Sequence, residues 1–215
     1  MKHSGVSCSV LTHSIRLQNS HQAEVSDLTP LAGLKHLKEL DLSEASDLDD
    51  LAPLGNLKRL NRLVLSCSAV SDLRPLAGLR NLEDLELRDT SVSDLSPLAA
   101  LEKLDFLHLG NVVKVHDLNP LADLKRLNWL VLYNTQVSDL TPLAGLINLE
   151  RLDVNGTRVR ELSPLAGLEK LDELDVVGAE IKVEDLAPLA GLKNLRSLSL
   201  SMTEGRDVTP LSGLE

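Results

Sequence analysis

Nine prolines divide this chain of 215 residues into units of nearly equal length. Successive prolines are 22 to 24 residues apart, and no proline lies outside the series. They stand at Pro30, Pro53, Pro75, Pro97, Pro120, Pro142, Pro164, Pro188 and Pro210. A fixed period of this length is the signature of stacked repeats, so the chain is predicted to form a solenoid rather than one globular core.

Leucine follows the same period. Six positions in each unit, at −2, +1, +4, +7, +10 and +12 from the proline, hold 48 of the 51 leucines. Around Pro75 they are Leu73, Leu76, Leu79, Leu82, Leu85 and Leu87. Where these positions are not leucine they are valine, at Val154, Val176 and Val208. Leucine is therefore predicted to build the core almost alone, in a chain with only three aromatic residues.

The spacing of leucine changes from three residues to two within each unit. Pro followed by Leu at +1 and +4, usually with Gly at +3, favours one short helical turn. A polar residue precedes the proline in six units and is expected to cap the turn: Thr29, Ser96, Asn119, Thr141, Ser163 and Thr209. The leucines at +10 and +12 alternate as in a short strand. Each unit is thus predicted to place a strand on one face and a helical turn on the other.

This pattern resembles the leucine-rich-repeat family, in the 22-residue class seen in internalins and in the regulatory subunit of protein phosphatase 1. The resemblance covers roughly residues 10–215. It implies an α/β fold: a curved right-handed solenoid of about nine strands, with a parallel sheet on the concave face and helical or 3-10 turns on the convex face. It also implies that the concave sheet binds another protein.

The chain departs from the family pattern at one position. The asparagine that the family places three residues after the second strand leucine is here a hydroxyl residue: Ser20, Ser68, Thr90, Thr135, Thr157 or Thr203. A hydroxyl can still bond to the turn backbone. Ala45, Val112 and Ala179 cannot, and these three lie in units with enlarged loops, at 43–52, 110–119 and 177–187. The enlarged loops indicate either duplication of a three-unit block or a functional rim beside the concave face.

The extent of the repeats predicts two domains. Residues 1–24 form an amino-terminal leader with a degenerate first repeat or cap, and residues 25–215 form the solenoid, with eight full repeats and a partial one. The carboxyl end stops within a repeat, which predicts an uncapped surface available for end-to-end self-association.

The net charge of −10 has a structural explanation. An acid stands three residues before every proline, at Asp27, Asp50, Asp72, Asp94, Asp117, Asp139, Glu161, Asp185 and Asp207. Removing these nine from the 32 acids leaves 23, which nearly balances the 22 lysines and arginines. Asp before a helical turn is expected to accept turn N–H bonds; a ladder of cation sites is the alternative. A negative chain is also not expected to bind nucleic acid.

The outward face of the sheet carries the functional prediction. Positions +9, +11 and +13 alternate with the buried leucines and should point away from the core. All three aromatic residues, Phe106, Trp129 and Tyr133, occupy such positions in two adjacent units. Gly110 beside Tyr133 is expected to leave room for a partner. The group is interpreted as a binding patch, with a sheet-stabilising cluster as the alternative.

We name two parts of this predicted site. The aromatic patch consists of Phe106, His108, Trp129, Val131 and Tyr133, and the acidic margin consists of Asp153, Glu173 and Asp175, with Arg151 between the two. This composition is typical of a hot spot. The expected partner is a protein or peptide that presents an apolar anchor next to Lys or Arg.

A non-enzymatic recognition module is favoured, and a sensing arm of a larger receptor, effector or NTPase-type signalling protein is the alternative, followed by a surface adhesin like the internalins. An enzyme would need an outward acid pair such as Asp84 with Glu86 or Asp153 with Asp175, but no nucleophile, phosphate loop or metal-ligand motif accompanies them. No cofactor or metal is therefore predicted. Without a secretory signal or an apolar stretch long enough to cross a bilayer, no membrane association and a cytoplasmic location are expected.

Overall fold

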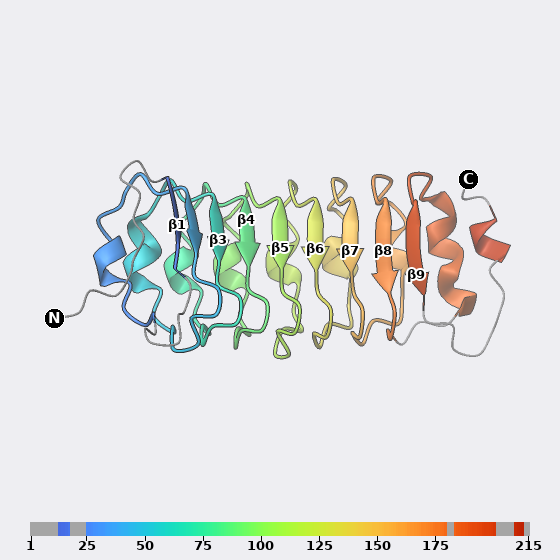
Figure 1. Ribbon diagram of the computed structural model, residues 1–215. Coiled ribbons are helices and arrows are strands. Elements are labelled where there is room, and N and C mark those ends of the chain that lie inside the picture. The colour runs from blue at the N-terminus through green and yellow to red at the C-terminus, as the bar shows by residue number, and fades with distance from the viewer. Residues whose placement is uncertain (1–12, 18–24, 180–182, 201–208, 213–215) are drawn as a thin grey trace.

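The computed structural model describes residues 13–17, 25–179, 183–200 and 209–212. Nine short strands in this part of the chain form one parallel sheet in sequence order (Figure 1). They are β1 (Ser14–Arg16), β2 (Glu39–Asp41), β3 (Arg62–Val64), β4 (Asp84–Glu86), β5 (Phe106–His108), β6 (Trp129–Val131), β7 (Arg151–Asp153), β8 (Glu173–Val176) and β9 (Ser197–Leu200).

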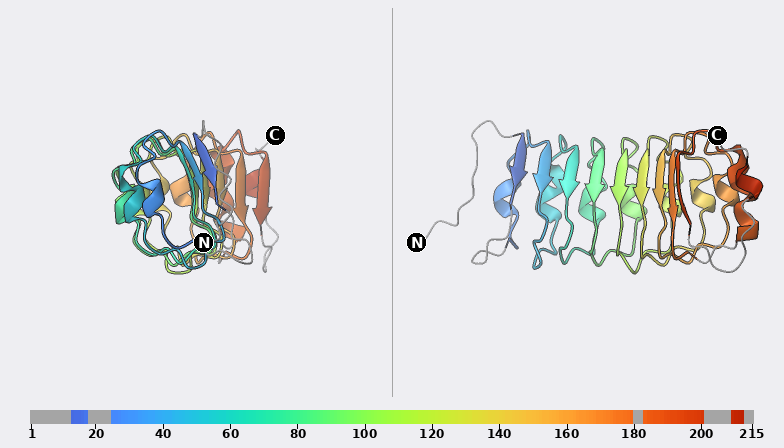
Figure 2. Two further views of the ribbon diagram at one scale, coloured as in Figure 1. Left: turned by 60° about the vertical axis from the view of Figure 1, so that its left-hand side comes forward. Right: turned by 45° about the vertical axis from the view of Figure 1, so that its right-hand side comes forward.

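A 3-10 helix follows each strand on the opposite face (Figures 1 and 2). The 3-10 helices are η1 (Thr29–Leu31), η2 (Ala52–Asn56), η3 (Arg74–Leu76), η4 (Ser96–Leu98), η5 (Asn119–Leu121), η6 (Thr141–Leu143), η7 (Ser163–Leu165), η8 (Val183–Gly191) and η9 (Thr209–Leu211). The predicted solenoid, with a curved sheet on one face and 3-10 turns on the other, is confirmed. Residues 1–12 and 18–24 lie outside the described residues, so the boundary at residue 24 stays a prediction.

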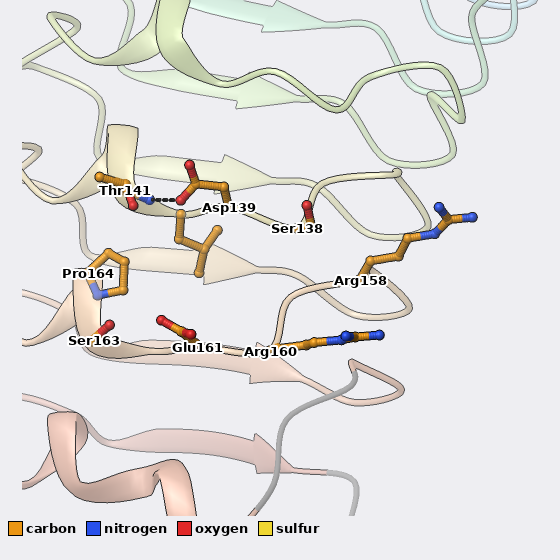
Figure 3. A pocket seen from close by; sticks show the side chains of 9 residues that line it. Ser138, Asp139, Thr141, Arg158, Arg160, Glu161, Ser163 and Pro164 are labelled. Carbon is orange, nitrogen blue, oxygen red and sulfur yellow. Dashed lines mark hydrogen bonds between the residues drawn. The ribbon is translucent and has the colours of Figure 1, made fainter.

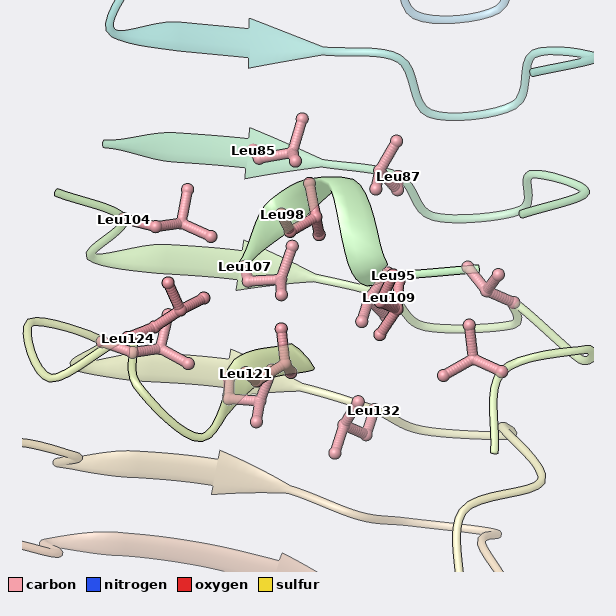
Figure 4. Packing of buried hydrophobic residues seen from close by; sticks show 14 of the residues in the cluster. Leu85, Leu87, Leu95, Leu98, Leu104, Leu107, Leu109, Leu121, Leu124 and Leu132 are labelled. Atoms are coloured by element: carbon pink, nitrogen blue, oxygen red, sulfur yellow. The ribbon is translucent and has the colours of Figure 1, made fainter. Parts of the chain in front are cut away.

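The core consists of the predicted leucine columns. From Leu37 to Leu192, every leucine of the six columns is at most 2% exposed, and Val154 and Val176 are buried in their place. Figure 4 shows these side chains between the strands and the 3-10 helices. Burying one leucine stabilises the fold by about 1.5–3 kcal/mol. A seventh buried column, five residues before the proline, was not predicted and consists of Leu48, Val70, Val92, Val115, Val137 and Val159.

The prediction that the polar residue before each proline caps the helical turn is wrong. The acid three residues before the proline acts as the cap instead. Each 3-10 helix from η1 to η7 begins at the residue before proline, preceded by a leucine that makes no side-chain cap bond. At η1 to η6 the carboxylate two residues before that position accepts its backbone N–H, as Asp139 does from Thr141 at 2.8 Å. The same bond joins Asp27 to Thr29, Asp50 to Ala52, Asp72 to Arg74, Asp94 to Ser96 and Asp117 to Asn119.

Six acids of the column therefore act as backbone caps, as the turn-bonding interpretation predicted. Glu161 makes no such bond among the described residues. Hydrogen bonds from the side chain and backbone of Thr141 lower the pKa of Asp139, and Thr29 lowers the pKa of Asp27 in the same way. The side chains of Asp185 and Asp207 lie outside the described part of the chain.

The hydroxyl column also behaves as predicted. Ser68, Thr90, Thr135 and Thr157 are buried, and each hydroxyl donates to the backbone carbonyl three residues earlier at 2.6–2.8 Å. Ala45 and Val112 are buried without such a bond.

The residue just before the hydroxyl column has a left-handed backbone. Its φ lies between 56° and 72° at Glu44, Cys67, Asp89, Asn111, Asn134, Gly156 and Gly178. Among these seven described positions, only those of the β7 and β8 units hold glycine, the residue for which this conformation carries no steric cost.

Candidate recognition surface

The parallel pairing brings the predicted site residues into two rows on the concave face. One row runs through Phe106, Trp129, Arg151 and Glu173, each paired with the next across adjacent strands. The second row runs in the same way through His108, Val131, Asp153 and Asp175. Tyr133 follows β6 on the same face. All nine predicted residues, with Leu152, line one open hollow of about 280 Å³.

The aromatic patch is a connected cluster of rings. The ring centroids of Phe106 and Trp129 lie 4.8 Å apart at 48°. His108 meets Phe106 edge-on at 6.2 Å and Tyr133 edge-on at 5.6 Å. Val131 is only 5% exposed and forms the floor, whereas Trp129 is 40% exposed. The patch therefore offers an accessible apolar surface over rings that hold one another in place.

Gly110 does not leave the opening that was expected. The Tyr133 ring already lies against it, so that a Cβ at Gly110 would overlap the Cζ and Cε1 atoms of Tyr133. Tyr133 lies just after β6, so strand alternation predicts its face of the sheet but not the rotamer of its side chain. Gly110 thus allows Tyr133 to fold down onto the sheet, and a partner would meet the ring rather than a gap.

His108 is held in its neutral form by its surroundings. Burial lowers the pKa of its imidazole, and the ring Nδ1 accepts the backbone N–H of Gly110 at 3.1 Å. A ring nitrogen that accepts this bond cannot carry a proton, so the remaining proton lies on Nε2.

Arg151 joins the aromatic patch to the acidic margin. Its guanidinium carbon lies 5.1 Å from the Trp129 ring centroid, which forms a cation–π pair. Its Nε is 3.5 Å from a carboxylate oxygen of Glu173. Asp153 and Asp175 have no ion pair in the described part of the chain. Burial, together with the nearby charges of Asp175 and Glu173, raises the pKa of Asp153.

The other outward acid pair is neutralised. Arg62 bonds to Asp84 and, at 2.6 Å, to Glu86. Among the described residues, no three His, Cys, Asp or Glu side chains converge on a candidate metal site. No helix of the described chain has the length and apolarity to span a bilayer.

Comparison with known proteins agrees with this architecture. A family profile described as "Leucine Rich repeats (2 copies)" matches residues 125–167. A search of curated protein sequences returned no match.

Solved structures give the broader similarity. An internalin, InlF, from Listeria monocytogenes is 32% identical with a TM-score of 0.87, over 94% of this chain and 58% of its own. Internalin C2 from the same organism is 33% identical with a TM-score of 0.83, over 88% of this chain and 80% of its own. The plant peptide hormone receptor RGFR1, solved in complex with RGF2, is 20% identical with a TM-score of 0.74, over 88% of this chain and 32% of its own, and shares the fold alone.

The chain thus spans little more than half of InlF but most of internalin C2. These similarities cover 94% and 88% of this chain, beyond the pair of repeats that the family profile matches. The chain belongs to the leucine-rich-repeat family, with repeats that resemble those of the internalins.

Proposed function

We propose that this chain is a non-enzymatic recognition module that binds a protein or peptide on its concave sheet, at the aromatic patch and acidic margin. The observation that carries the proposal is the exposed ring of Trp129 beside two carboxylates, Asp153 and Asp175, that have no ion pair with any described residue. Fixed aromatic groups next to charge are typical of binding hot spots.

The partner is a segment with an apolar or aromatic anchor followed by Lys or Arg. The hollow of about 280 Å³ has room for one large side chain over the floor formed by Val131. A cation one or two residues further along would reach Asp153 and Asp175, whose mutual repulsion it would relieve. A phosphate-bearing ligand would meet these carboxylates with like charge, which disfavours nucleic acid at this surface.

The test selects peptides from a random library against the wild-type chain. Selected peptides should combine an aromatic residue with Lys or Arg. A variant with Trp129→Ala and Tyr133→Ala should bind them at least about 30-fold more weakly, because truncating one anchor can cost about 2 kcal/mol.

Arg62→Ala is the matched control, since it changes the same concave face three strands away from Trp129. It should leave peptide affinity unchanged. Equal binding of the selected peptides to the wild type and the Trp129, Tyr133 variant would disprove the site.

The biological setting is a separate part of the proposal. A cytoplasmic module, a sensing arm of a larger receptor or effector, and a surface adhesin would all use the same patch. The complex of RGFR1 with RGF2 shows that a solenoid of this fold can serve a receptor in a complex. Fractionation of the native cells would separate an exported adhesin from a cytoplasmic protein.

A further inference from the structure

The concave face exposes a second apolar side chain beyond the acidic margin. Trp129 on β6 is 40% exposed, and Val177, which follows β8 directly, is 44% exposed. Both stand in the outward columns of the repeat, at +9 and +13 from the proline. Three further large apolar side chains are exposed among the described residues, at other positions of the repeat: Leu34, Val113 and Ile147.

The pairing register gives the position of Val177 relative to the hollow. Val131, the floor of the hollow, pairs with Asp153, which pairs with Asp175 on β8 (Figure 1). Val177 is two residues beyond Asp175. Two strand spacings of about 4.8 Å and two residues of about 3.3 Å place it about 12 Å from Val131. An extended peptide spans this distance in about four residues, and its side chains at i, i+2 and i+4 point to the same side.

The side-chain amide of Asn155 lies beside this path. Its Oδ1 accepts the Val177 N–H at 2.6 Å, and the Asn155 N–H is bonded to Oδ1 of Asp153 at 2.9 Å. Because a backbone N–H needs an acceptor, the first bond fixes which end of the amide is the oxygen. The other end, Nδ2, is a donor that makes no hydrogen bond with any described residue. Asn155 is half-buried, so this donor is accessible to a partner.

The equivalent position in the β2 unit is closed. The N–H and the hydroxyl of Ser43 both donate to Oδ1 of Asp41, at 3.0 and 2.6 Å. The other oxygen of that carboxylate pairs with Arg16 at 2.8 Å. Asp153, in contrast, has no ion pair within the described ranges. The β7 unit therefore keeps an open carboxylate and an open amide donor where the β2 unit keeps neither.

The larger hollow at the edge of the solenoid lacks this combination. It measures about 420 Å³ and opens between the loops that precede η6 and η7 (Figure 3). Charges of both signs line it, from Asp139 and Glu161 to Arg158 and Arg160, so it favours no ligand by charge. Asp139 is also committed to the Thr141 N–H.

We propose that the bound segment continues from the aromatic patch to Asn155 and Val177 as an extended peptide with contacts at i, i+2 and i+4. This inference rests on the proposed function. The aromatic anchor at i fills the hollow, Lys or Arg at i+2 lies over Asp153 and Asp175, and an aliphatic side chain at i+4 packs on Val177. Nδ2 of Asn155 donates to a main-chain carbonyl of the segment. Because every peptide has such carbonyls, Asn155 contributes affinity, whereas Val177 selects the residue at i+4.

The contact at Val177 is tested with peptides selected from a random library against the wild-type chain. They should carry an aliphatic residue four positions from the aromatic one, with Lys or Arg midway. Fluorescence anisotropy then compares one selected peptide with its analogue that has Ser at i+4. The wild type should bind the selected peptide about fivefold more tightly. Val177→Ser should bind both peptides equally, whereas Val113→Ser, a matched change of an exposed valine in the loop 110–119, should keep the preference.

Asn155→Asp tests the amide donor. The variant keeps an oxygen that can accept the Val177 N–H but replaces Nδ2 by a second acceptor. Binding of the selected peptide should weaken about tenfold, because a peptide carbonyl would then face an oxygen without a proton. If this region acted only through its charge, the added carboxylate would instead tighten binding of a cationic peptide. Ser43→Ala, in the same outward column, is the control and should leave the affinity unchanged.

The variant with Trp129→Ala and Tyr133→Ala separates this inference from the proposed function, and circular dichroism verifies that every variant is folded. The extension alone is wrong if that variant loses binding while Val177→Ser keeps the fivefold preference or Asn155→Asp binds at least as tightly as the wild type. Selected peptides without an aliphatic residue four positions from the aromatic one would also overturn it. Undiminished binding by the Trp129, Tyr133 variant would disprove the aromatic site, and this inference with it.

Discussion

The two halves of the concave face stand on the same scaffold and differ in how their charges are arranged. On β1–β4 each cation has carboxylate partners: Arg16 bonds to Asp41 at 2.8 Å, and Arg62 bonds to both Asp84 and Glu86. On β5–β8, Arg151 lies between Trp129 and Glu173, and Asp153 and Asp175 have no ion pair in the part of the chain that the structure describes. The leucines beneath both halves are equally buried. Repeats whose leucine columns are equally buried can therefore arrange their outward charges differently in different regions.

Truncation of a buried leucine should have the largest effect on stability, and the loss should be the same in both halves. Leu63→Ala under the amino-terminal half and Leu107→Ala under the aromatic patch should each lower the free energy of unfolding by about 3 kcal/mol, because both side chains are fully buried. Urea denaturation measures this. A difference between the two variants well above 1 kcal/mol would show that the scaffold is not uniform.

The left-handed turn position should respond in opposite directions in the two halves. Gly156→Ala should destabilise by about 1 kcal/mol, since its φ is 64° and a Cβ would overlap the Asn134 side chain. Cys67→Gly, at φ 60°, should stabilise by about 0.5 kcal/mol as the steric cost outweighs the added chain entropy. Thermal unfolding shows whether each substitution raises or lowers the melting temperature. Loss of stability in Cys67→Gly would mean that the contacts of its thiol with Arg88 and Asp89 outweigh the backbone cost.

Neutralising one acid in each half should also give opposite signs. Asp153→Asn should stabilise by up to about 0.5 kcal/mol near pH 7, because it removes a half-buried charge that faces other carboxylates. Glu86→Gln should destabilise by up to about 1 kcal/mol through loss of its pair with Arg62.

The pH dependence of unfolding identifies why Asp153→Asn should stabilise the chain. The pKa of Asp153 is raised in the folded chain, so the folded state holds its proton more tightly than the unfolded state. The cost of the charge is therefore present above that raised pKa and disappears as pH falls through it. The advantage of Asp153→Asn in urea denaturation should vanish at low pH. An advantage that persists there would point to packing instead of charge.

The smallest expected effect is spectroscopic. Trp129 is the single tryptophan of the chain and is 40% exposed, so its emission should be quenched by acrylamide. Arg151→Ala removes the guanidinium above the ring and should increase the quenching, whereas Arg62→Ala should not. Blue emission that resists acrylamide would contradict the outward position of Trp129.

Much of the fold could be predicted because period and chemistry agree in every unit. The leucine columns fixed which residues of each strand face inward, and that register placed Trp129 beside Phe106 and Arg151. The caps were assigned wrongly because proline is the second residue of the 3-10 helices η1 to η7, so the polar residue before it lies inside the helix. Its backbone N–H then needs an acceptor, which Asp139 and its equivalents supply.

Two features of the site depend on local backbone that the alternation does not describe. Tyr133 and Gly110 lie just beyond their strands, where side-chain direction is set by the rotamer and the turn. The left-handed backbone could be anticipated at Gly156 and Gly178, because glycine adopts it readily. It could not be anticipated at Cys67 or Glu44, because residues of these types rarely have a positive φ. Sequence patterns thus locate the site, and the turns decide its detailed shape.

The in-register pairing of the strands makes sequence distance a direct measure of spatial distance on the concave face. One unit along the chain moves an outward side chain by one strand, about 4.8 Å. Insertion of a complete unit between β6 and β7 would therefore move Asp153 away from the aromatic patch by one fixed step while the leucine columns continue unbroken. The spacing between two recognition elements can in this way change by whole units, independently of the core that supports them.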